Sequence, residues 1–186
     1  MIAAVVLAAG ASTRLGEPKQ LVTLAGEMLL ERAVRTAREA GCSPVVVVLG
    51  ASAERIEQQC DLSDAMVVVN DLWSEGMGSS IRIGMAEVRD ADGVVLMTCD
   101  QPSVTSFHLR ALMDSGGITA SEYAGRRGVP AYFPKAAFAG LMELHGDMGA
   151  RDLLREAAAV GLPGGELDVD TAADVAAAEL LFRTRE

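Results

Sequence analysis

Three short apolar runs without a charged residue place the strongest constraint on the fold. They are IAAVVLAA over residues 2–9, VVVVL over Val45–Leu49 and GVVLMT over Gly93–Thr98. Short runs rich in β-branched residues are typical of strands that are covered on both faces of a parallel sheet. Between them, residues 28–40 have apolar positions at helical spacing and end at Gly41, a typical helix C-cap. This alternation predicts an α/β fold of three layers: a mostly parallel sheet with helices on both faces, and ligands bound beyond the carboxyl ends of the strands.

Weaker patterns complete the expected order of elements. A third strand is expected over residues 67–69, and further helices over residues 53–60, 79–88, 135–144, 150–159 and 172–181. In residues 117–134 two extended segments flank Gly125 and Gly128, which predicts a small antiparallel excursion beside the site. No Pro/Ser-rich linker divides the chain, and 186 residues suffice for one substantial core. We therefore expect one domain over residues 1–186.

Charge and cysteine usage narrow the class of partner. The net charge of −10 disfavours nucleic acid or an anionic membrane as partner, because the overall field attracts neither. The apolar N-terminal run is short and no Lys or Arg precedes it, which does not fit a signal peptide, and no stretch is long enough to span a bilayer. The cysteines Cys42, Cys60 and Cys99 are scattered and far from metal-ligand spacing. We expect a cytoplasmic protein in which a local basic cluster binds any anionic substrate.

The loop after the first strand supplies such a cluster. LAAGASTRLGEPK, from Leu7 to Lys19, contains Arg14 and Lys19 between small residues, and Lys19 is one of only two lysines in the chain. Gly10 and Gly16 permit backbone angles that turn amide groups toward an anion, and a compact ammonium suits a polyphosphate. The spacing fits neither the dinucleotide G-x-G-x-x-G nor a P-loop. An ordinary turn with solvated Arg and Lys stays open as the alternative.

Two carboxylate positions follow later in the chain. Asp100 follows the run 93–98 with only Cys99 between them, at a position where a hard cation such as Mg²⁺ finds a first ligand. Alternatively Asp100 caps the next helix, although Ser103 or Thr105 suits that role. In LDVDTAAD, Asp168 and Asp170 alternate along an extended segment, so both lie on one face. Capping of the last helix by Asp170 or Thr171 is the equally open alternative.

Two further loops are rich in glycine. WSEGMGSS ends in Gly78, Ser79 and Ser80, which suit close approach to a base and ribose, or else cap the following helix. In GDMGAR, Asp147 and Arg151 are four residues apart across an expected helix start. They form either a cap with a local ion pair or a substrate-phosphate contact through Arg151.

Taken in order, LAAGASTRLGEPK, NDLWSEGMGSSIRIG, CDQP, GVP, GDMGAR and DVDTAAD resemble the motifs of the molybdenum cofactor cytidylyltransferases, the MocA-like branch of the MobA-like nucleotidyltransferase family. The resemblance implies the nucleotide-diphospho-sugar transferase type of fold and transfer of CMP from CTP to the terminal phosphate of molybdopterin, releasing pyrophosphate. It implies Mg²⁺ as cofactor and a transient contact with a molybdenum hydroxylase apoenzyme. The implied catalytic groups are Arg14, Lys19 and Asp100, and the implied metal ligands are Asp100, Asp168 and Asp170. The implied nucleotide contacts are Leu7, Ala8, Ala9, Gly10, Ser12, Gly16, Gly78, Ser79 and Ser80, and the implied substrate contacts are Gln101, Pro130, Asp147 and Arg151.

Other functions stay open from the sequence. A guanylyltransferase that uses GTP, or a nucleotidyltransferase acting on a sugar or polyol phosphate, shares the loop and the cation site. A non-catalytic molybdenum cofactor carrier for a molybdenum hydroxylase belongs to a different class and tolerates loss of Asp100. A NAD-binding oxidoreductase fits least well, because the glycine spacing differs from the dinucleotide pattern.

Overall fold

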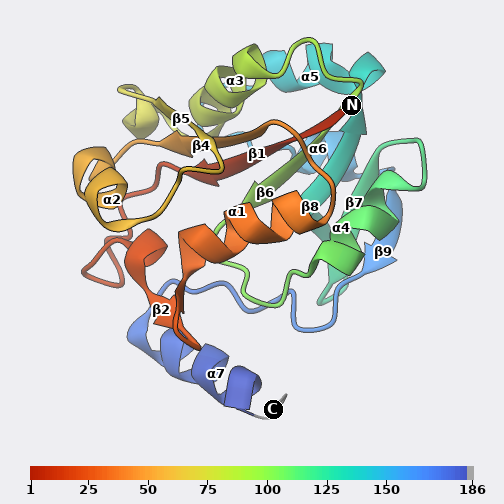
Figure 1. The fold of residues 1–186 in the computed structure, drawn as a ribbon. Helices are drawn as coiled ribbons and strands as arrows, with labels where there is room; N and C mark the ends of the chain where they lie inside the picture. The colour runs from red at the N-terminus through yellow and green to blue at the C-terminus, as the bar shows by residue number, and fades with distance from the viewer. Residues whose placement is uncertain (184–186) are drawn as a thin grey trace.

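The structure is a computed structural model that describes residues 1–183; residues 184–186 of the expected domain lie outside the described part. A seven-stranded sheet forms its centre, in the order β5-β4-β1-β6-β8-β7-β9 (Figure 1). The strands are β1 (Ile2–Ala8), β4 (Val45–Leu49), β5 (Met66–Val69), β6 (Gly93–Thr98), β7 (Thr119–Tyr123), β8 (Arg126–Pro134) and β9 (Ala158–Gly161). Only β8 runs antiparallel to its neighbours β6 and β7. The expected mostly parallel sheet is therefore confirmed.

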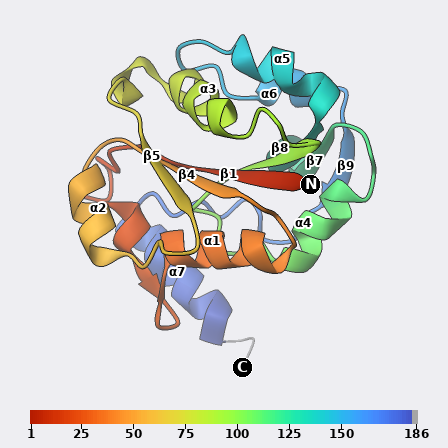
Figure 2. The ribbon, with the colours of Figure 1, turned by 45° about the horizontal axis from the view of Figure 1, so that its top comes forward.

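Helices cover both faces of this sheet, which makes three layers (Figure 2). On one face lie α1 (Leu29–Glu39), α2 (Ala53–Gln59) and α4 (Ser106–Met113); on the other lie α3 (Met77–Glu87), α5 (Phe138–Met142) and α6 (Arg151–Leu154). Alternate strand residues divide between the two cores: Ala4 and Val6 of β1 pack on the first face, and Ala3 and Val5 on the second. Strands that are covered on both faces have no polar side, which explains their uninterrupted apolar sequence.

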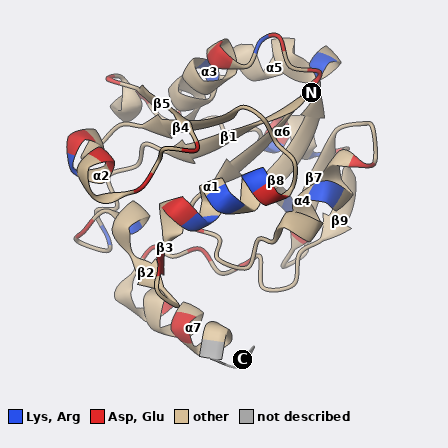
Figure 3. Ribbon diagram, in the orientation of Figure 1, with Lys and Arg blue, Asp and Glu red and all other residues tan. Residues whose placement is uncertain are grey.

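Charged residues gather on the helices and loops, while β1, β4 and β6 carry none (Figure 3). Charged side chains near these three strands therefore lie at the strand ends, where the strands continue into loops. The carboxyl ends of β1, β4 and β6 lie at one edge of the sheet, because these strands are parallel neighbours. Among residues 1–183, none of the helices combines the length and the apolar character needed to cross a membrane.

A small hairpin and the last helix form an appendix below the main layers. Strands β2 (Thr23–Leu24) and β3 (Glu27–Met28) pair antiparallel, and α7 (Ala172–Arg183) packs beside them (Figure 1). The apolar residues Val22, Leu24 and Leu29 meet Val169 and Ala178 in a cluster of their own. The sequence analysis missed this hairpin, because two-residue strands leave no periodic pattern.

The C-terminal third contains the largest errors of the sequence analysis. The helix expected over residues 150–159 is wrong: α6 ends at Leu154, and β9 follows as an edge strand parallel to β7. Alanine favours helices, but the AAVG segment pairs with the edge of β7, where the Ala158 N–H donates to the carbonyl of Ile118, so tertiary pairing outweighs local propensity. The helix expected over residues 135–144 is shortened to a 3₁₀ turn at Lys135–Ala137 and α5. The antiparallel excursion expected in residues 117–134 is confirmed as the β7–β8 hairpin.

Candidate functional site

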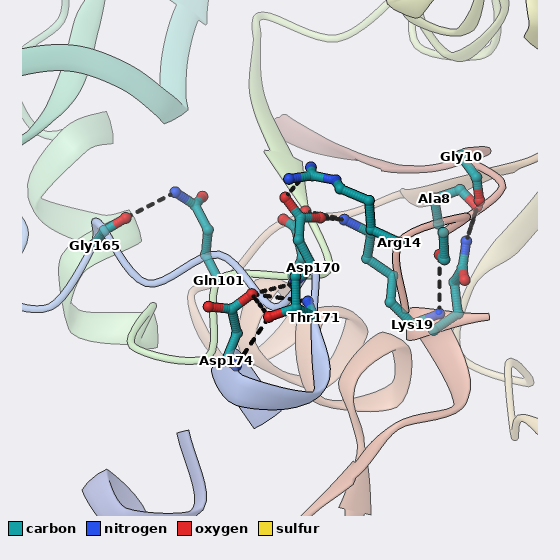
Figure 4. A network of polar contacts seen from close by, with 12 residues as sticks. Ala8, Gly10, Arg14, Lys19, Gln101, Gly165, Asp170, Thr171 and Asp174 are labelled. Atoms are coloured by element: carbon teal, nitrogen blue, oxygen red, sulfur yellow. Dashed lines mark hydrogen bonds and ion pairs between the residues drawn. The ribbon is translucent and has the colours of Figure 1, made fainter. Parts of the chain in front are cut away.

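The candidate site lies at the carboxyl ends of β1 and β6, where a lysine joins two carboxylates. The Nζ atom of Lys19 lies 2.7 Å from Oδ2 of Asp100. It lies 2.5 Å from Oδ1 of Asp170 (Figure 4). These residues come from the loop after β1, the loop after β6 and the segment before α7. The structure therefore brings together the cation and the two carboxylates that the sequence singles out.

The loop after β1 is built around Ser12. The Ser12 carbonyl accepts hydrogen bonds from the N–H groups of Leu15 and Gly16, and its hydroxyl accepts one from the Lys19 amide at 3.1 Å. Gly16 has a φ of +83°, in the left-handed region that favours glycine, so the chain turns back there toward Lys19. Within the described residues, the N–H groups of residues 11–14 donate no hydrogen bond. These amides are available to an anion, as expected for a phosphate-binding loop.

Arg14 extends from this loop and is mostly exposed. Its Nη2 atom lies 2.7 Å from Oδ2 of Asp170, with 71% of the side chain exposed (Figure 4). An exposed ion pair of this kind contributes little to stability, so it can be exchanged for a ligand at small cost. Arg14 and Lys19 therefore place two positive charges at the site, one largely exposed and one largely buried.

Gln20 holds the loop after β1 through hydrogen bonds, although its sequence pattern did not indicate this role. The residue is 1% exposed, and its Nε2 atom donates to the carbonyl of Ala8 at 2.6 Å and to that of Gly10 at 3.4 Å. This ties the loop to the end of β1. A glutamine beside a functional lysine gives no signal in a single sequence, because only the fold shows that it is buried.

The position of Asp170 is set by the backbone of its neighbours. The N–H of Val169 donates to the carbonyl of Asp100 at 2.9 Å, and the Val169 side chain is fully buried. Because side chains alternate along an extended segment, Asp168 and Asp170 point away from that buried face. Thr171 and Asp174 cap α7 reciprocally: Oδ2 of Asp174 accepts from the Thr171 N–H at 2.8 Å, and the Thr171 hydroxyl accepts from the Asp174 N–H at 3.3 Å. The alternative that Asp170 is the cap is therefore wrong, and its carboxylate faces the site.

The surroundings of Asp100 also leave its carboxylate to the site. Thr105 caps α4, since its hydroxyl accepts a hydrogen bond from the N–H of His108 at 3.2 Å. Gln101 is buried, and its Nε2 atom donates to the hydroxyl of Tyr123 and to the carbonyl of Gly165, both at 3.2 Å. The expected substrate contact Gln101 thus holds the loop after β6 against the β7–β8 hairpin and the 162–170 segment.

The electrostatics differ sharply among the charged groups. Burial alone would lower the pKa of Lys19, but the charges and hydrogen bonds of Asp100 and Asp170 raise it above its ordinary value. For Asp170, burial works to raise the pKa, but Lys19 and Arg14 hold it below its usual range. Burial, together with the charge of Asp100, raises the pKa of Asp168 to about 6. Asp168 therefore differs from Asp170: Lys19 and Arg14 stabilise the charge of Asp170, whereas the charge of Asp168 is disfavoured beside Asp100.

The loop before α3 is held by its own side chains. Asn70 donates to the hydroxyls of Ser79 and Ser80, both at 2.9 Å, and the Ser79 hydroxyl donates to the carbonyl of Gly76 at 2.8 Å. Both serines are buried, and α3 begins at Met77 without a side-chain cap, so neither serine is the N-cap. Their contact with a nucleotide stays a prediction.

In the described part of the structure, the remaining expected substrate residues form no hydrogen bond or ion pair with Lys19, Asp100 or Asp170. Pro130 precedes Ala131, which pairs with Leu96 of β6, so it lies beside the end of that strand. Asp147 and Arg151 are exposed, and their segment packs against the loop before α3, where the N–H of Gly78 donates to the carbonyl of Gly146 at 2.9 Å. The described ion pairs do not include one between Asp147 and Arg151.

Asp100 and Asp170 suit a divalent cation whose remaining ligands are water or phosphate oxygens. In residues 1–183, no group of three or more His, Cys, Asp or Glu side chains is arranged to hold a metal ion. Asp100 and Asp170 nevertheless converge on one cation, the Lys19 ammonium, so their geometry permits shared coordination. Mg²⁺ is commonly held by one or two carboxylates and completed by water and phosphate oxygens, and these two residues fit that pattern.

Comparisons with known proteins point to one family. A model described as the MobA-like NTP transferase domain matches residues 4–160. The chain is 35% identical to nicotine blue oxidoreductase of Paenarthrobacter nicotinovorans over 167 residues, 83% of this chain and 82% of that protein. It is 33% identical to the purine catabolism protein PucB of Bacillus subtilis over 190 residues, 90% of each. The crystal structure of Rv0371c from Mycobacterium tuberculosis H37Rv in complex with manganese superposes with a TM-score of 0.80 at 34% identity, covering 96% of this chain and 98% of that one.

Proposed function

The chain belongs to the MobA-like NTP transferase family, and from this premise we propose that it transfers CMP from CTP to the terminal phosphate of molybdopterin and releases pyrophosphate. The observation that carries the proposal is the meeting of Lys19 with Asp100 and Asp170, beside a loop whose amides at residues 11–14 are available to an anion. This arrangement offers positive charge and backbone donors for a triphosphate, together with carboxylates for a divalent cation.

The reaction asks the protein for positioning and charge neutralisation. An oxygen of the acceptor phosphate forms a bond to the α-phosphorus of CTP, the bond from that phosphorus to the α,β-bridging oxygen breaks, and pyrophosphate leaves with the bonding electrons. Arg14, Lys19 and the loop amides bind the β- and γ-phosphates and stabilise the charge that develops on the leaving group. No protein nucleophile is needed. Cys99, fully enclosed behind Asp100, has its pKa raised by burial and stays an unreactive thiol.

A divalent cation completes the proposal, with Asp100 and Asp170 as the residues that would hold it and Asp168 beside them. When bound, such a cation supplies neutralisation of the triphosphate charge. The manganese complex of the 34% identical relative supports the use of a divalent cation. Mg²⁺ is the ion we propose for this chain, because it is suited to carboxylates shared with phosphate oxygens.

The choice of CTP rests on the LAAG form of the loop, through its resemblance to the cytidylyl branch. GTP-dependent transfer and transfer to a sugar or polyol phosphate are the alternatives with the same site. We further propose that residues 1–186 act as one domain in the cytoplasm, in transient contact with the apoenzyme of a molybdenum hydroxylase. A non-catalytic carrier of the molybdenum cofactor would contact the same apoenzyme but would not need Asp100.

A second candidate function comes from the 35% identical relative, which is named an oxidoreductase. A reductase needs a site for a hydride donor, and the loop at residues 7–19 lacks the dinucleotide pattern. The ion-paired carboxylates Asp100 and Asp170 have no evident role in hydride transfer, whereas they suit a triphosphate bound with a divalent cation. The similarity to a protein named an oxidoreductase therefore calls for a direct assay of reductase activity, while nucleotidyl transfer stays the main proposal.

One assay separates these functions. Purified protein is incubated with Mg²⁺, molybdopterin and each nucleoside triphosphate in turn, and pyrophosphate release and the dinucleotide product are measured; NADH and NADPH oxidation is measured in parallel with nicotine blue. We expect pyrophosphate release with CTP and its loss in Asp100→Asn. Release with GTP only would assign the guanylyl branch, and consumption of reduced nicotinamide without pyrophosphate would assign the oxidoreductase. If the Asp100→Asn variant still delivers cofactor to an apoenzyme, the protein would be assigned as a carrier.

A further inference from the structure

The Lys19 ammonium is held unusually firmly for a surface lysine. Its side chain is 15% exposed, and its partners Asp100 and Asp170 are 17% and 28% exposed. Contacts of 2.7 Å and 2.5 Å between ionised groups are charge-assisted hydrogen bonds, and partial burial strengthens them because solvent screens them less. The chain's other lysine, Lys135, is exposed and forms no ion pair among the described residues.

The oxygens that bind Lys19 are the ones that a divalent cation requires. Oδ2 of Asp100 and Oδ1 of Asp170 face one another across the ammonium, and Arg14 takes the other Asp170 oxygen. A divalent cation that contacts both carboxylates therefore displaces the ammonium or lies beside it, where like charges repel. The two carboxylates use two of the three N–H donors of the Lys19 ammonium, so only one donor is left for a nucleotide phosphate while both contacts persist.

We propose that Lys19 competes with the divalent cation for Asp100 and Asp170, so that it lowers the cation affinity of the protein until a nucleotide phosphate draws the ammonium away. The last part of this inference rests on the proposed function. A lysine suits such an exchange, because its compact charge is carried on a flexible four-carbon stem. The binding of nucleotide and the binding of cation are thereby coupled through one side chain.

The contacts of 2.7 Å and 2.5 Å to Asp100 and Asp170 hold the Lys19 ammonium at the carboxylates. Only an anion that offers the ammonium other oxygens removes it. Triphosphate oxygens do so, whereas neutral ligands do not.

The inference predicts an effect of unusual sign. Substitution of a positively charged residue in a binding site commonly weakens binding of the natural ligand, but here Lys19→Met or Lys19→Gln strengthens the binding of a divalent cation. Removal of the ammonium leaves the two carboxylates facing one another, with Asp170 still paired to Arg14, and their mutual repulsion favours a cation. We expect the dissociation constant for Mn²⁺ to fall by about tenfold, which corresponds to about 1.4 kcal/mol.

The test is a Mn²⁺ titration followed by electron paramagnetic resonance, made without nucleotide. It compares the wild-type protein with Lys19→Met, Lys19→Gln, Lys135→Met and Asp170→Asn. Lys135→Met is the matched control: it removes the same charge from the opposite edge of the sheet, where the Lys135 N–H donates to the carbonyl of Asp92. We expect tighter Mn²⁺ binding in the two Lys19 variants, no change in Lys135→Met and weaker binding in Asp170→Asn.

Unchanged or weaker Mn²⁺ binding in a folded Lys19 variant would overturn the competition, as would equal tightening in Lys135→Met, which would reduce the effect to net charge. The far-ultraviolet circular dichroism of each variant checks the fold, and Lys19→Gln retains a polar group if Lys19→Met is poorly folded. CTP binding by the wild-type protein is measured separately. Its absence would refute the proposed function, whereas the Mn²⁺ comparison needs no nucleotide and is decided on its own.

Discussion

Asp168→Asn is expected to stabilise the protein at neutral pH, although it changes a residue of the candidate site. Asp168 is half-buried close to Asp100, and burial with that neighbouring charge raises its pKa to about 6. The ordinary value is 3.8. A carboxyl whose charged form is disfavoured in the folded protein lowers stability wherever it must ionise.

The magnitude follows from the two pKa values. A pKa of about 6 in place of 3.8 corresponds to about 3 kcal/mol of unfavourable free energy for the ionised side chain at neutral pH. Partial solvation of Asp168 and relaxation around it reduce this figure, so we expect Asp168→Asn to gain about 1–2 kcal/mol at pH 8. Asparagine keeps the shape and loses the charge, which makes it the appropriate replacement.

The pH dependence gives the sign of the effect. Because the folded pKa is higher than the unfolded one, the contribution of Asp168 is fully favourable below pH 4 and is lost as the pH rises through 6. Urea unfolding of both proteins at pH 4, 6 and 8 should therefore show no difference at pH 4 and a growing advantage of Asp168→Asn above it.

Asp170→Asn provides the matched control two residues away. Lys19 and Arg14 hold the pKa of Asp170 below its usual range, so loss of its charge should lower stability at neutral pH. Opposite signs for the two variants at pH 8 support this account of the site. Equal effects, or an Asp168→Asn variant that is less stable than the wild type at pH 8, would refute the reasoning.

Three further predictions concern catalysis, acid stability and packing. Lys19→Ala should lower the turnover at saturating CTP about hundredfold, by about 3 kcal/mol, whereas Glu17→Gln, at an exposed position, should leave it nearly unchanged. Burial holds the pKa of His108 below its ordinary value, so the wild type should lose stability as the pH falls below 6.5, and His108→Gln should lose less in urea unfolding at pH 5. In Gly84→Ala the added Cβ lies 2.5 Å from Cγ1 of Val5 and 2.9 Å from Cγ2 of Val48, so calorimetry should show about 1–3 kcal/mol lower stability despite the better helix propensity of alanine.

The central strands could be predicted because their sequences admit little else. The runs at residues 2–9, 45–49 and 93–98 have no polar side, and such runs are stable only between two helical layers. The position of Asp100 at the carboxyl edge followed from the end of one of these runs. The alternation of Asp168 and Asp170 about a buried Val169 likewise followed from period-two geometry, and the structure confirms it.

Elements held by distant partners could not be predicted in this way. The AAVG segment of β9 becomes a strand only because β7 leaves an edge beside it. Gln20 acts through the carbonyls of Ala8 and Gly10, which lie twelve and ten residues away in the chain. The Lys19 bridge is of the same kind: each residue could be selected, but the direct pairing of the lysine with both carboxylates depends on the meeting of three separate loops.

The meeting of these loops depends on a core separate from the two main ones. Leu15 of the loop after β1 and Leu29 of α1 pack in the same cluster as Val169, which stands between the two aspartates. Val22 and Leu24 of the hairpin and Ala178 of α7 complete that cluster. The loop after β1 and the carboxylate segment are therefore positioned against one another by shared apolar contacts, and not by their charges alone. The segment that contributes Asp170 lies beyond residue 160, where the family match ends, and this cluster and the hydrogen bond from the Val169 N–H to the Asp100 carbonyl hold it to the rest of the fold.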